Sequence, residues 1–231
     1  MRVAVIPARG GSKRIPRKNI RDFAGKPIIG YSIECALQSG LFDRVIVSTD
    51  DAEIARTALA FGAEVPFTRP AAISDDHAET ISVVAHAIGL LRSGGADPTA
   101  VCCIYATAPF MQQEDLAAGL RVLETGNWQF VFSATEFSSS VYRAFQENAA
   151  GGLQMLFPEH LGSRSQDLQE VLHDAAQFYW GRPQAWLDRA RIFGETSTVV
   201  RIPRERVQDL DTEEDWSQAS AMMASLQGRT S

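Results

Sequence analysis

A short glycine-containing stretch near the N-terminus carries the densest cluster of side chains that could do chemistry. Residues 7–19 read PARGGSKRIPRKN and follow directly on an apolar run. The two adjacent glycines let backbone N–H groups approach an anion closely. Arg9 can hold phosphate oxygens with two nitrogens, while Lys13 and Lys18 act as mobile point charges. The stretch lacks the ending of a P-loop and the third glycine of the dinucleotide fingerprint, so it predicts a nucleoside triphosphate site of another type.

An acidic segment near the other end of the chain supplies a second candidate group. Five acids fall within seven residues: Asp209, Asp211, Glu213, Glu214 and Asp215. In an extended segment, residues two apart point the same way, so Asp209 and Asp211 could converge on one hard cation. The other three acids suit the first turn of a helix, which Asp211 or the threonine after it could cap. Basic and acidic clusters together indicate a polyanion site with a metal partner, although a solvated loop and helix-dipole acids would also explain them.

Composition narrows the class of protein. The chain has 231 residues, 45% hydrophobic and 22% charged, as in one large soluble globular domain. A net charge of −6 argues against a protein that coats nucleic acid, and apolar runs of a few residues argue against a membrane span. The start of the chain turns basic too soon for a signal peptide. Cys35, Cys102 and Cys103 cannot all pair and lack metal spacing, which favours buried, reduced thiols in a cytoplasmic protein.

Short apolar runs alternate with stretches of helical periodicity. Strands are expected at residues 3–6, 44–49, 63–67, 100–105, 130–134, 176–180 and 198–202. Helices are expected at residues 27–40, 50–62, 79–92, 114–124, 183–190 and 212–226. This alternation predicts an α/β fold with a mostly parallel sheet and helices on both faces. Ligands bind at the carboxyl ends of the strands in such sheets, which is where the basic loop begins.

The alternation is interrupted in the second half of the chain. Residues 148–152 are rich in turn formers, and the flanking residues 143–146 and 153–157 could form a hairpin. We therefore expect a single domain over residues 1–231, with an inserted subdomain at residues 137–181.

Several motifs together carry a family resemblance. The sequence IPARGGSK at residues 6–13, followed by Lys18 and Asn19, resembles the signature of cytidylyltransferases that activate nine-carbon sugar acids as CMP-sugars. Further motifs stand in the expected order, namely RPA at 69–71, AET at 78–80, TAP at 107–109 and DLDT at 209–212. The resemblance covers nearly the whole chain. It implies a fold like that of the nucleotide-diphospho-sugar transferases, a Rossmann-like sheet, with the inserted subdomain forming a dimer.

The resemblance assigns the nucleotide side of the site. It implies that the first loop holds CTP through Ala8, Arg9, Gly10, Ser12, Lys13, Lys18 and Asn19. A second loop would recognise cytosine and ribose through Arg69, Ala78 and Thr80. Asp209 and Asp211 match the carboxylates that bind Mg²⁺ in the family. Two alternatives stay open: a surface ion pair for Arg69 and an ordinary helix start for Thr80.

Departures from the pattern of the sialic acid synthetases indicate the sugar. Tyr105 and Ala106 replace a usual Gln-Pro pair, and HDAAQFYW at residues 173–180 lacks a usual Asn-Gly pair. Both features resemble the pseudaminic acid cytidylyltransferases. Candidate sugar contacts are Tyr105, Thr107, Arg143, Arg164, Gln166, Asp167, Gln177 and Tyr179. His173 and Asp174 could be a catalytic pair or a structural hydrogen bond.

The implied reaction transfers CMP from CTP to the C2 hydroxyl of a nonulosonic acid and releases pyrophosphate. Pseudaminic acid is the expected acceptor. Sialic, legionaminic and 3-deoxy-octulosonic acids remain alternatives, as does a nucleotide-binding regulator without catalysis. Lys18, Asp211 and Arg143 are the expected catalytic residues, with Asp211 or a metal-bound water as the base. Expected partners are CTP, the sugar acid, Mg²⁺ and a second copy of the chain, whose site Arg164 could enter. No nucleic-acid or membrane partner is expected.

Overall fold

A six-stranded sheet forms the centre of the protein, and the computed structural model describes residues 1–75 and 78–228. The strand order is β10-β6-β9-β5-β1-β4. The strands are β1 (Arg2–Pro7), β4 (Arg44–Ser48), β5 (Ala100–Ile104), β6 (Phe130–Glu136), β9 (Leu172–Gly181) and β10 (Ser197–Arg201). Neighbours pair in parallel except for β9, which runs antiparallel to both β5 and β6. The predicted mostly parallel sheet is confirmed.

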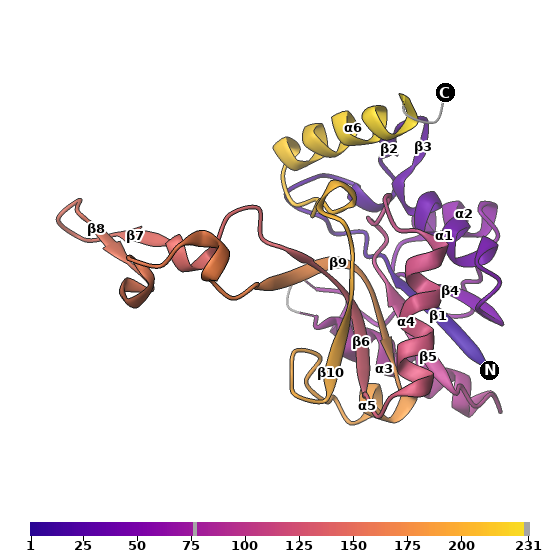
Figure 1. Ribbon diagram of the computed structural model, residues 1–231. Coiled ribbons are helices and arrows are strands. Elements are labelled where there is room, and N and C mark those ends of the chain that lie inside the picture. The colour runs from indigo at the N-terminus through magenta and orange to yellow at the C-terminus, as the bar shows by residue number, and fades with distance from the viewer. Residues whose placement is uncertain (76–77, 229–231) are drawn as a thin grey trace.

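Helices cover both faces of the sheet (Figure 1). The helices on one face are α1 (Ile28–Gln38), α2 (Ala52–Ala60) and α4 (Gln113–Thr125). Those on the other face are α3 (Thr80–Ser93) and α5 (Pro183–Leu187). The side chains of β1 alternate between the two layers, because Ala4 and Ile6 pack in the first and Val3 and Val5 in the second. A strand buried on both faces needs a continuous apolar run, which is what the sequence supplies there.

The C-terminal helix packs against the basic N-terminal loop. Helix α6 (Glu213–Gly228) buries Trp216, Ala219 and Met223 at helical spacing against the short strand β2 (Asp22–Phe23) and the start of α1. The equally short strand β3 (Lys26–Pro27) pairs with β2. The rings of Phe23 and Trp216 meet edge to face at 5.4 Å. This contact brings the acidic segment, 192 residues away in sequence, beside the basic loop.

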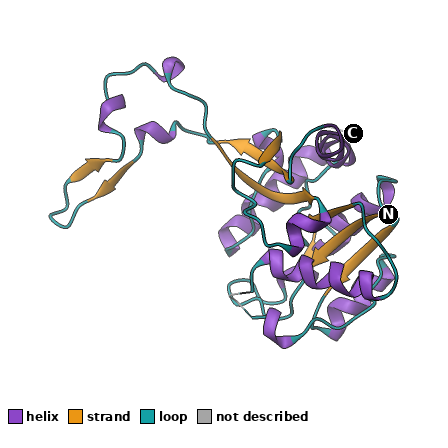
Figure 2. Cartoon of the chain, turned by 90° about the horizontal axis from the view of Figure 1, so that it is seen from below, coloured by secondary structure: helices purple, strands orange, loops and turns teal. Residues whose placement is uncertain are grey.

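Residues 137–171 leave the body of the molecule as an arm (Figures 1 and 2). It ends in the hairpin β7 (Phe145–Glu147) and β8 (Leu153–Met155), which confirms the predicted hairpin in shorter form. The predicted insertion extends to residue 181, but the structure places residues 172–181 in the main sheet as β9. This strand pairs on both sides through an apolar run that ends in Phe178, Tyr179 and Trp180.

The bounds of three other predicted elements differ from those in the structure. Residues 63–67 form no strand: Glu64 makes an isolated bridge to Ile46 of β4, and Thr68 makes another to Thr49, just after β4. Strand β9 begins at Leu172, four residues early, and the last helix before β10 ends at Leu187. All three cysteines are free; Cys102 and Cys103 are buried and Cys35 is half-buried. Among the residues that the structure describes, no helix has the length and apolar character needed to cross a membrane.

Candidate active site

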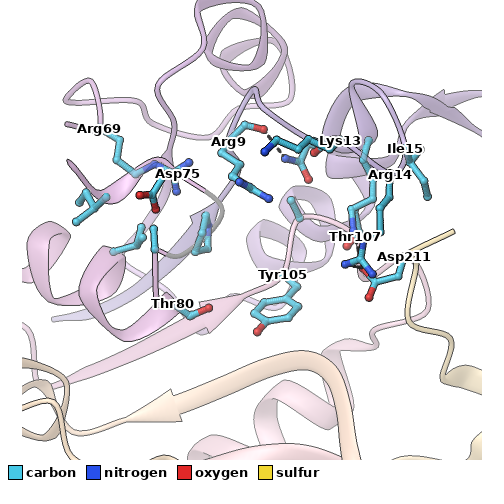
Figure 3. A pocket seen from close by; sticks show the side chains of 18 residues that line it. Arg9, Lys13, Arg14, Ile15, Arg69, Asp75, Thr80, Tyr105, Thr107 and Asp211 are labelled. Carbon is cyan, nitrogen blue, oxygen red and sulfur yellow. Dashed lines mark hydrogen bonds and ion pairs between the residues drawn. The ribbon is translucent and has the colours of Figure 1, made fainter. Parts of the chain in front are cut away.

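A basic cavity of about 260 Å³ opens at the carboxyl ends of β1 and β5 (Figure 3). Most of the predicted nucleotide residues meet on its wall, although they come from three distant segments. The sequence-predicted residues that line it are Arg9, Ser12, Lys13, Lys18, Asn19, Arg69, Ala78, Thr80, Tyr105, Thr107 and Asp211. Thr107 was predicted on the sugar side, but it lies here.

The first loop is shaped by hydrogen bonds from residues behind the cavity. Ala8 N–H donates to the carbonyl of Ser48 at 2.9 Å, and Asn19 Nδ2 donates to the carbonyl of Arg9 at 2.9 Å. Gly10 N–H donates to Asp50 Oδ1 at 3.0 Å. A Cβ on Gly10 would lie 2.7 Å from an Asp51 carboxylate oxygen, so the close approach requires glycine. Ala8 and Gly10 are therefore supports of the loop and not part of the cavity wall.

Arg17 and Asp51 fasten this loop to helix α2. Arg17 has a left-handed backbone (φ 56°), and its Nη1 lies 2.6 Å from Asp51 Oδ2. The other oxygen of Asp51 accepts the N–H groups of Glu53 and Ile54, both at 2.9 Å, and so caps α2. The hydrogen bond from Arg17 lowers the pKa of Asp51 to about 2.

Arg69 lies on the opposite side of the cavity from Asp211 (Figure 3). Its side chain is only 3% exposed, so it is not a surface residue. Nε donates to Ser74 Oγ at 3.2 Å, and Nη2 lies 3.5 Å from Asp50 Oδ1. Burial lowers the pKa of this guanidinium, and Asp50 opposes that effect. Asp50 therefore joins the first loop, through Gly10, to the second loop.

Asp211 faces the cavity and is surrounded by cations. Lys18 Nζ donates to the carbonyl of Leu210 at 2.6 Å and lies 3.5 Å from Asp211 Oδ1. Arg14 Nη2 lies 2.8 Å from the same oxygen. Asp215 accepts the N–H groups of Asp211 and Thr212 at 3.1 and 2.7 Å, which orders the turn. Thr212 accepts the N–H of Asp215, so Thr212, and not Asp211, caps α6.

Asp209 lies beside Asp211 but is not part of the cavity wall. Burial of its carboxyl group raises the pKa of Asp209, and the charge of Asp211 raises it further. Two adjacent carboxylates of like charge fit a hard divalent cation, and Mg²⁺ commonly uses one or two carboxylates together with substrate phosphates. Within residues 1–75 and 78–228, no group of three or more His, Cys, Asp or Glu side chains could hold a metal.

A second cavity of about 430 Å³ adjoins the first and shares Thr80 and Tyr105 with it. Tyr179 donates its hydroxyl hydrogen to Asp174 Oδ2, and the rings of Tyr105 and Tyr179 lie 5.3 Å apart. The predicted sugar residues Tyr105 and Tyr179 therefore meet at the boundary between a basic cavity and a more apolar one.

Other predicted sugar residues lie elsewhere. Gln177 is buried in β9, where Nε2 donates to the carbonyl of Arg206 at 2.6 Å. Arg143 donates to the carbonyls of Leu161 (2.9 Å) and Ser163, and thus holds the arm together. Four residues belong to the arm and line neither cavity: Arg143, Arg164, Gln166 and Asp167.

His173 and Asp174 do not pair through their side chains. Nδ1 of His173 lies 2.8 Å from the backbone oxygen of Asp174, which is the structural alternative. Phe178 and Trp180 are fully buried, as packing residues are.

Sequence reasoning missed several wall residues. Arg14 and Asp75 line the first cavity, and Arg189, Arg191 and Phe193 line the second. Arg14 belongs to the basic run and could have been found there. The other four have no local signal, because only the folded chain brings them to a cavity.

Comparison with known proteins places the chain among enzymes. A family model described as Cytidylyltransferase matches residues 3–176. The chain belongs to the cytidylyltransferase family. The predicted family and the predicted enzyme class, nucleotidyltransferase, are confirmed.

Relatives of this family member include three bacterial enzymes. Pseudaminic acid cytidylyltransferase of Campylobacter jejuni (serotype O:2) is 47% identical over 213 residues, which are 92% of each chain. A Helicobacter pylori protein named pseudaminic acid cytidylyltransferase and UDP-2,4-diacetamido-2,4,6-trideoxy-beta-L-altropyranose hydrolase is 37% identical over 90% of this chain and 40% of its own. N-acylneuraminate cytidylyltransferase of Escherichia coli is 26% identical over 94% of this chain and 51% of its own.

Solved structures confirm the fold. CMP:2-keto-3-deoxy-manno-octonic acid synthetase, solved in complex with CTP, matches with a TM-score of 0.69 at 18% identity, over 97% of this chain and 98% of that one. 4-Diphosphocytidyl-2C-methyl-D-erythritol synthase of Anaerococcus prevotii matches with a TM-score of 0.62 at 13% identity, over 96% and 98%.

Proposed function

We propose that this protein transfers CMP from CTP to the C2 hydroxyl of pseudaminic acid and releases pyrophosphate. The observation that carries the proposal is the pair of adjoining cavities. One is lined by Arg and Lys side chains and reaches Asp211, the other contains Asp174 and two tyrosines, and they meet at Thr80 and Tyr105. A transferase of this kind must hold a polyanion and a polar sugar acid in contact. The 47% identity to the Campylobacter jejuni enzyme, over 92% of both chains, supports pseudaminic acid as the acceptor.

The basic wall suits the charge that develops during transfer. The C2 oxygen forms a bond to the α-phosphorus, the bond between that phosphorus and the bridging α–β oxygen breaks, and pyrophosphate leaves with the bonding electrons. Arg9, Lys13 and Lys18 would stabilise the negative charge on pyrophosphate. The backbone near Ala78, with the buried Arg69 behind it, would hold the base and ribose. Positioning supplies most of the rate in such reactions.

Asp209 and Asp211 would hold Mg²⁺. Mg²⁺, when bound, neutralises phosphate charge and lowers the pKa of a coordinated hydroxyl. Asp211 also lies on the cavity wall, where its carboxylate could accept the proton of the C2 hydroxyl. Its Oδ1 is held by Arg14 and Lys18. These two cations would also contact the phosphates, so they link nucleotide binding to the position of the acid.

The arm supports the proposal of a homodimer. Phe145, Leu153 and Leu161 on the arm are 58%, 71% and 64% exposed. Exposed apolar residues on a narrow extension with little core indicate a surface that another chain covers. We propose that a second copy of this chain covers it and that Arg164, which lies on the arm and lines neither cavity of its own chain, reaches the partner's site. Arg143 would then act by fixing the segment that carries Arg164.

The test is pyrophosphate release by the purified protein with CTP and Mg²⁺. Pseudaminic acid, N-acetylneuraminic acid and N,N'-diacetyllegionaminic acid are supplied separately, and Asp211→Asn serves as the inactive control. The proposal predicts release with pseudaminic acid at a kcat/KM at least ten times higher than with the other two. Release with another acid at the higher rate would change the acceptor but keep the nucleotide assignment. No release with any acid would contradict the proposed activity.

A further inference from the structure

The second cavity contains a carboxylate that neither the nucleotide site nor the metal pair uses. Asp174 lines this cavity together with Tyr105, Tyr179 and the apolar side chains of Ile81 and Ile192. It lies at the point where β9 meets the cavity, 35 residues before the metal segment in sequence. Its chemistry can therefore be considered apart from phosphate transfer.

The position of the carboxylate is fixed from two sides. Ala176 N–H donates to Asp174 Oδ1 at 2.9 Å, and the hydroxyl of Tyr179 donates to Oδ2. An ionised carboxylate has about four acceptor positions. Two remain for a ligand, and among residues 1–75 and 78–228 no Lys or Arg forms an ion pair with this group.

The backbone around Asp174 departs from a regular strand. The register between β6 and β9 shifts between Phe132 and Ala134, opposite this point. Ala176 has a φ of 52°, in the left-handed region that a non-glycine residue rarely adopts. Such irregularities often redirect a side chain near a functional site. Here the left-handed turn aims the Ala176 N–H at the Asp174 carboxylate.

We infer that Asp174 is a specificity-determining residue that accepts a hydrogen bond from an acylamino N–H of the sugar acid. The inference rests on the proposed function and deepens it. A pinned carboxylate offers only acceptor atoms, so it favours a ligand that presents a donor. The neighbouring Ile81 and Ile192 favour a donor attached to an apolar group, which an acylamino substituent provides and a hydroxyl does not. The site therefore selects sugar acids that are N-acylated at this position.

The substitution Asp174→Asn tests this with little change in shape. In the variant, the Ala176 N–H still donates to the amide oxygen. The position of Oδ2 is then taken by an NH₂ group, which is a donor and cannot accept a hydrogen bond from the N–H of the ligand. The matched control is Asp188→Asn, because Asp188 is exposed, accepts from Gln184 Nε2 at 2.7 Å and lines neither cavity. Melting temperatures show whether both variants fold.

Three quantities are measured: kcat/KM for pseudaminic acid, KM for CTP, and the affinity for pseudaminic acid by calorimetry without CTP. Charge-assisted hydrogen bonds contribute enough for a 10- to 100-fold loss. We expect Asp174→Asn to lose roughly that factor in kcat/KM and in affinity, with KM for CTP within twofold. A structural defect would raise KM for CTP as well, because Tyr105 belongs to both cavities.

Two results would overturn the inference: unchanged affinity for pseudaminic acid in Asp174→Asn, or an equal loss on the CTP side. A nonulosonic acid with hydroxyls in place of its acylamino groups is measured as a competitor. Its inhibition constant should differ by less than threefold between wild type and variant. Failure of the proposed function would instead be seen in the assay of the wild-type protein, which would release no pyrophosphate. Calorimetry would still decide the role of Asp174 in that case.

Discussion

A nearly buried ion pair, Arg206 with Asp115, holds the segment that leads to Asp209 and Asp211. Arg206 Nη1 and Nη2 lie 2.5 and 3.1 Å from the two oxygens of Asp115, and both side chains are 12% exposed. The carbonyl of Arg206 also accepts from Gln177 in β9. The pair thus joins the start of α4, the sheet and the chain just before Asp209.

Asp115→Ala would leave the guanidinium buried without its charged partner. Removing one member of a buried pair typically costs about 3–5 kcal/mol, and the 12% exposure of both groups puts this pair near the lower end, at roughly 3 kcal/mol. For a chain of this size, that is a fall in melting temperature of about 6–12 °C. Urea denaturation with a common m value gives the free energy of unfolding directly.

The chain offers a control with similar geometry and more solvent. Arg44 binds Glu64 with two nitrogens, but these side chains are 28% and 46% exposed. Glu64→Ala should therefore cost no more than about 1 kcal/mol. The reasoning fails if Asp115→Ala loses less than 1 kcal/mol, or no more than Glu64→Ala loses.

Further predictions follow from the loop, the acid pair and the arm. Gly10→Ala should raise KM for CTP several-fold in steady-state assays, because its Cβ would displace Asp51; an unchanged KM would contradict the loop geometry. The pKa of Asp51 in the folded protein is about 2, below its ordinary 3.8, so its ionised carboxylate stabilises the fold by about 2 kcal/mol. This stabilisation is present above pH 5 and is lost between pH 4 and 2. Acid unfolding of Asp51→Asn should therefore lack the loss of stability that the wild type shows in this pH range. Asp211→Asn should lower kcat by at least 100-fold while nucleotide affinity, measured by calorimetry, changes less than threefold. Leu153→Asp should convert a dimer to a monomer in light scattering. A dimer that persists would contradict the proposal that the arm forms the dimer interface.

Much of the lining of the first cavity could be predicted from the sequence because many of its residues are close in the chain. Arg9, Lys13 and Lys18 lie on one loop after one strand, and parallel-sheet topology fixes where such a loop opens. The pairing of that loop with Asp211 could be suspected from charge alone. The packing of Trp216 on Phe23, which produces it, could not be read from either segment separately.

The lining of the second cavity could be predicted less well because tertiary contacts decide it. Polar residues at the start of β9 hid four residues of strand, and the left-handed Ala176 has no signal in the sequence. Gln177 is a polar residue in an apolar stretch, yet it is buried and donates to the carbonyl of Arg206. Arg189 and Arg191 reach the second cavity from a turn after α5, where no periodicity applies.

The most direct test of the account is identification of the product. Purified protein is incubated with CTP, Mg²⁺ and pseudaminic acid, and the mixture is analysed by mass spectrometry and ³¹P NMR. The account predicts one phosphodiester product with the mass of CMP-pseudaminic acid, formed in equal amount with pyrophosphate. Pyrophosphate accompanied by free CMP, or CTP left intact with every sugar acid supplied, would contradict transfer to the C2 hydroxyl.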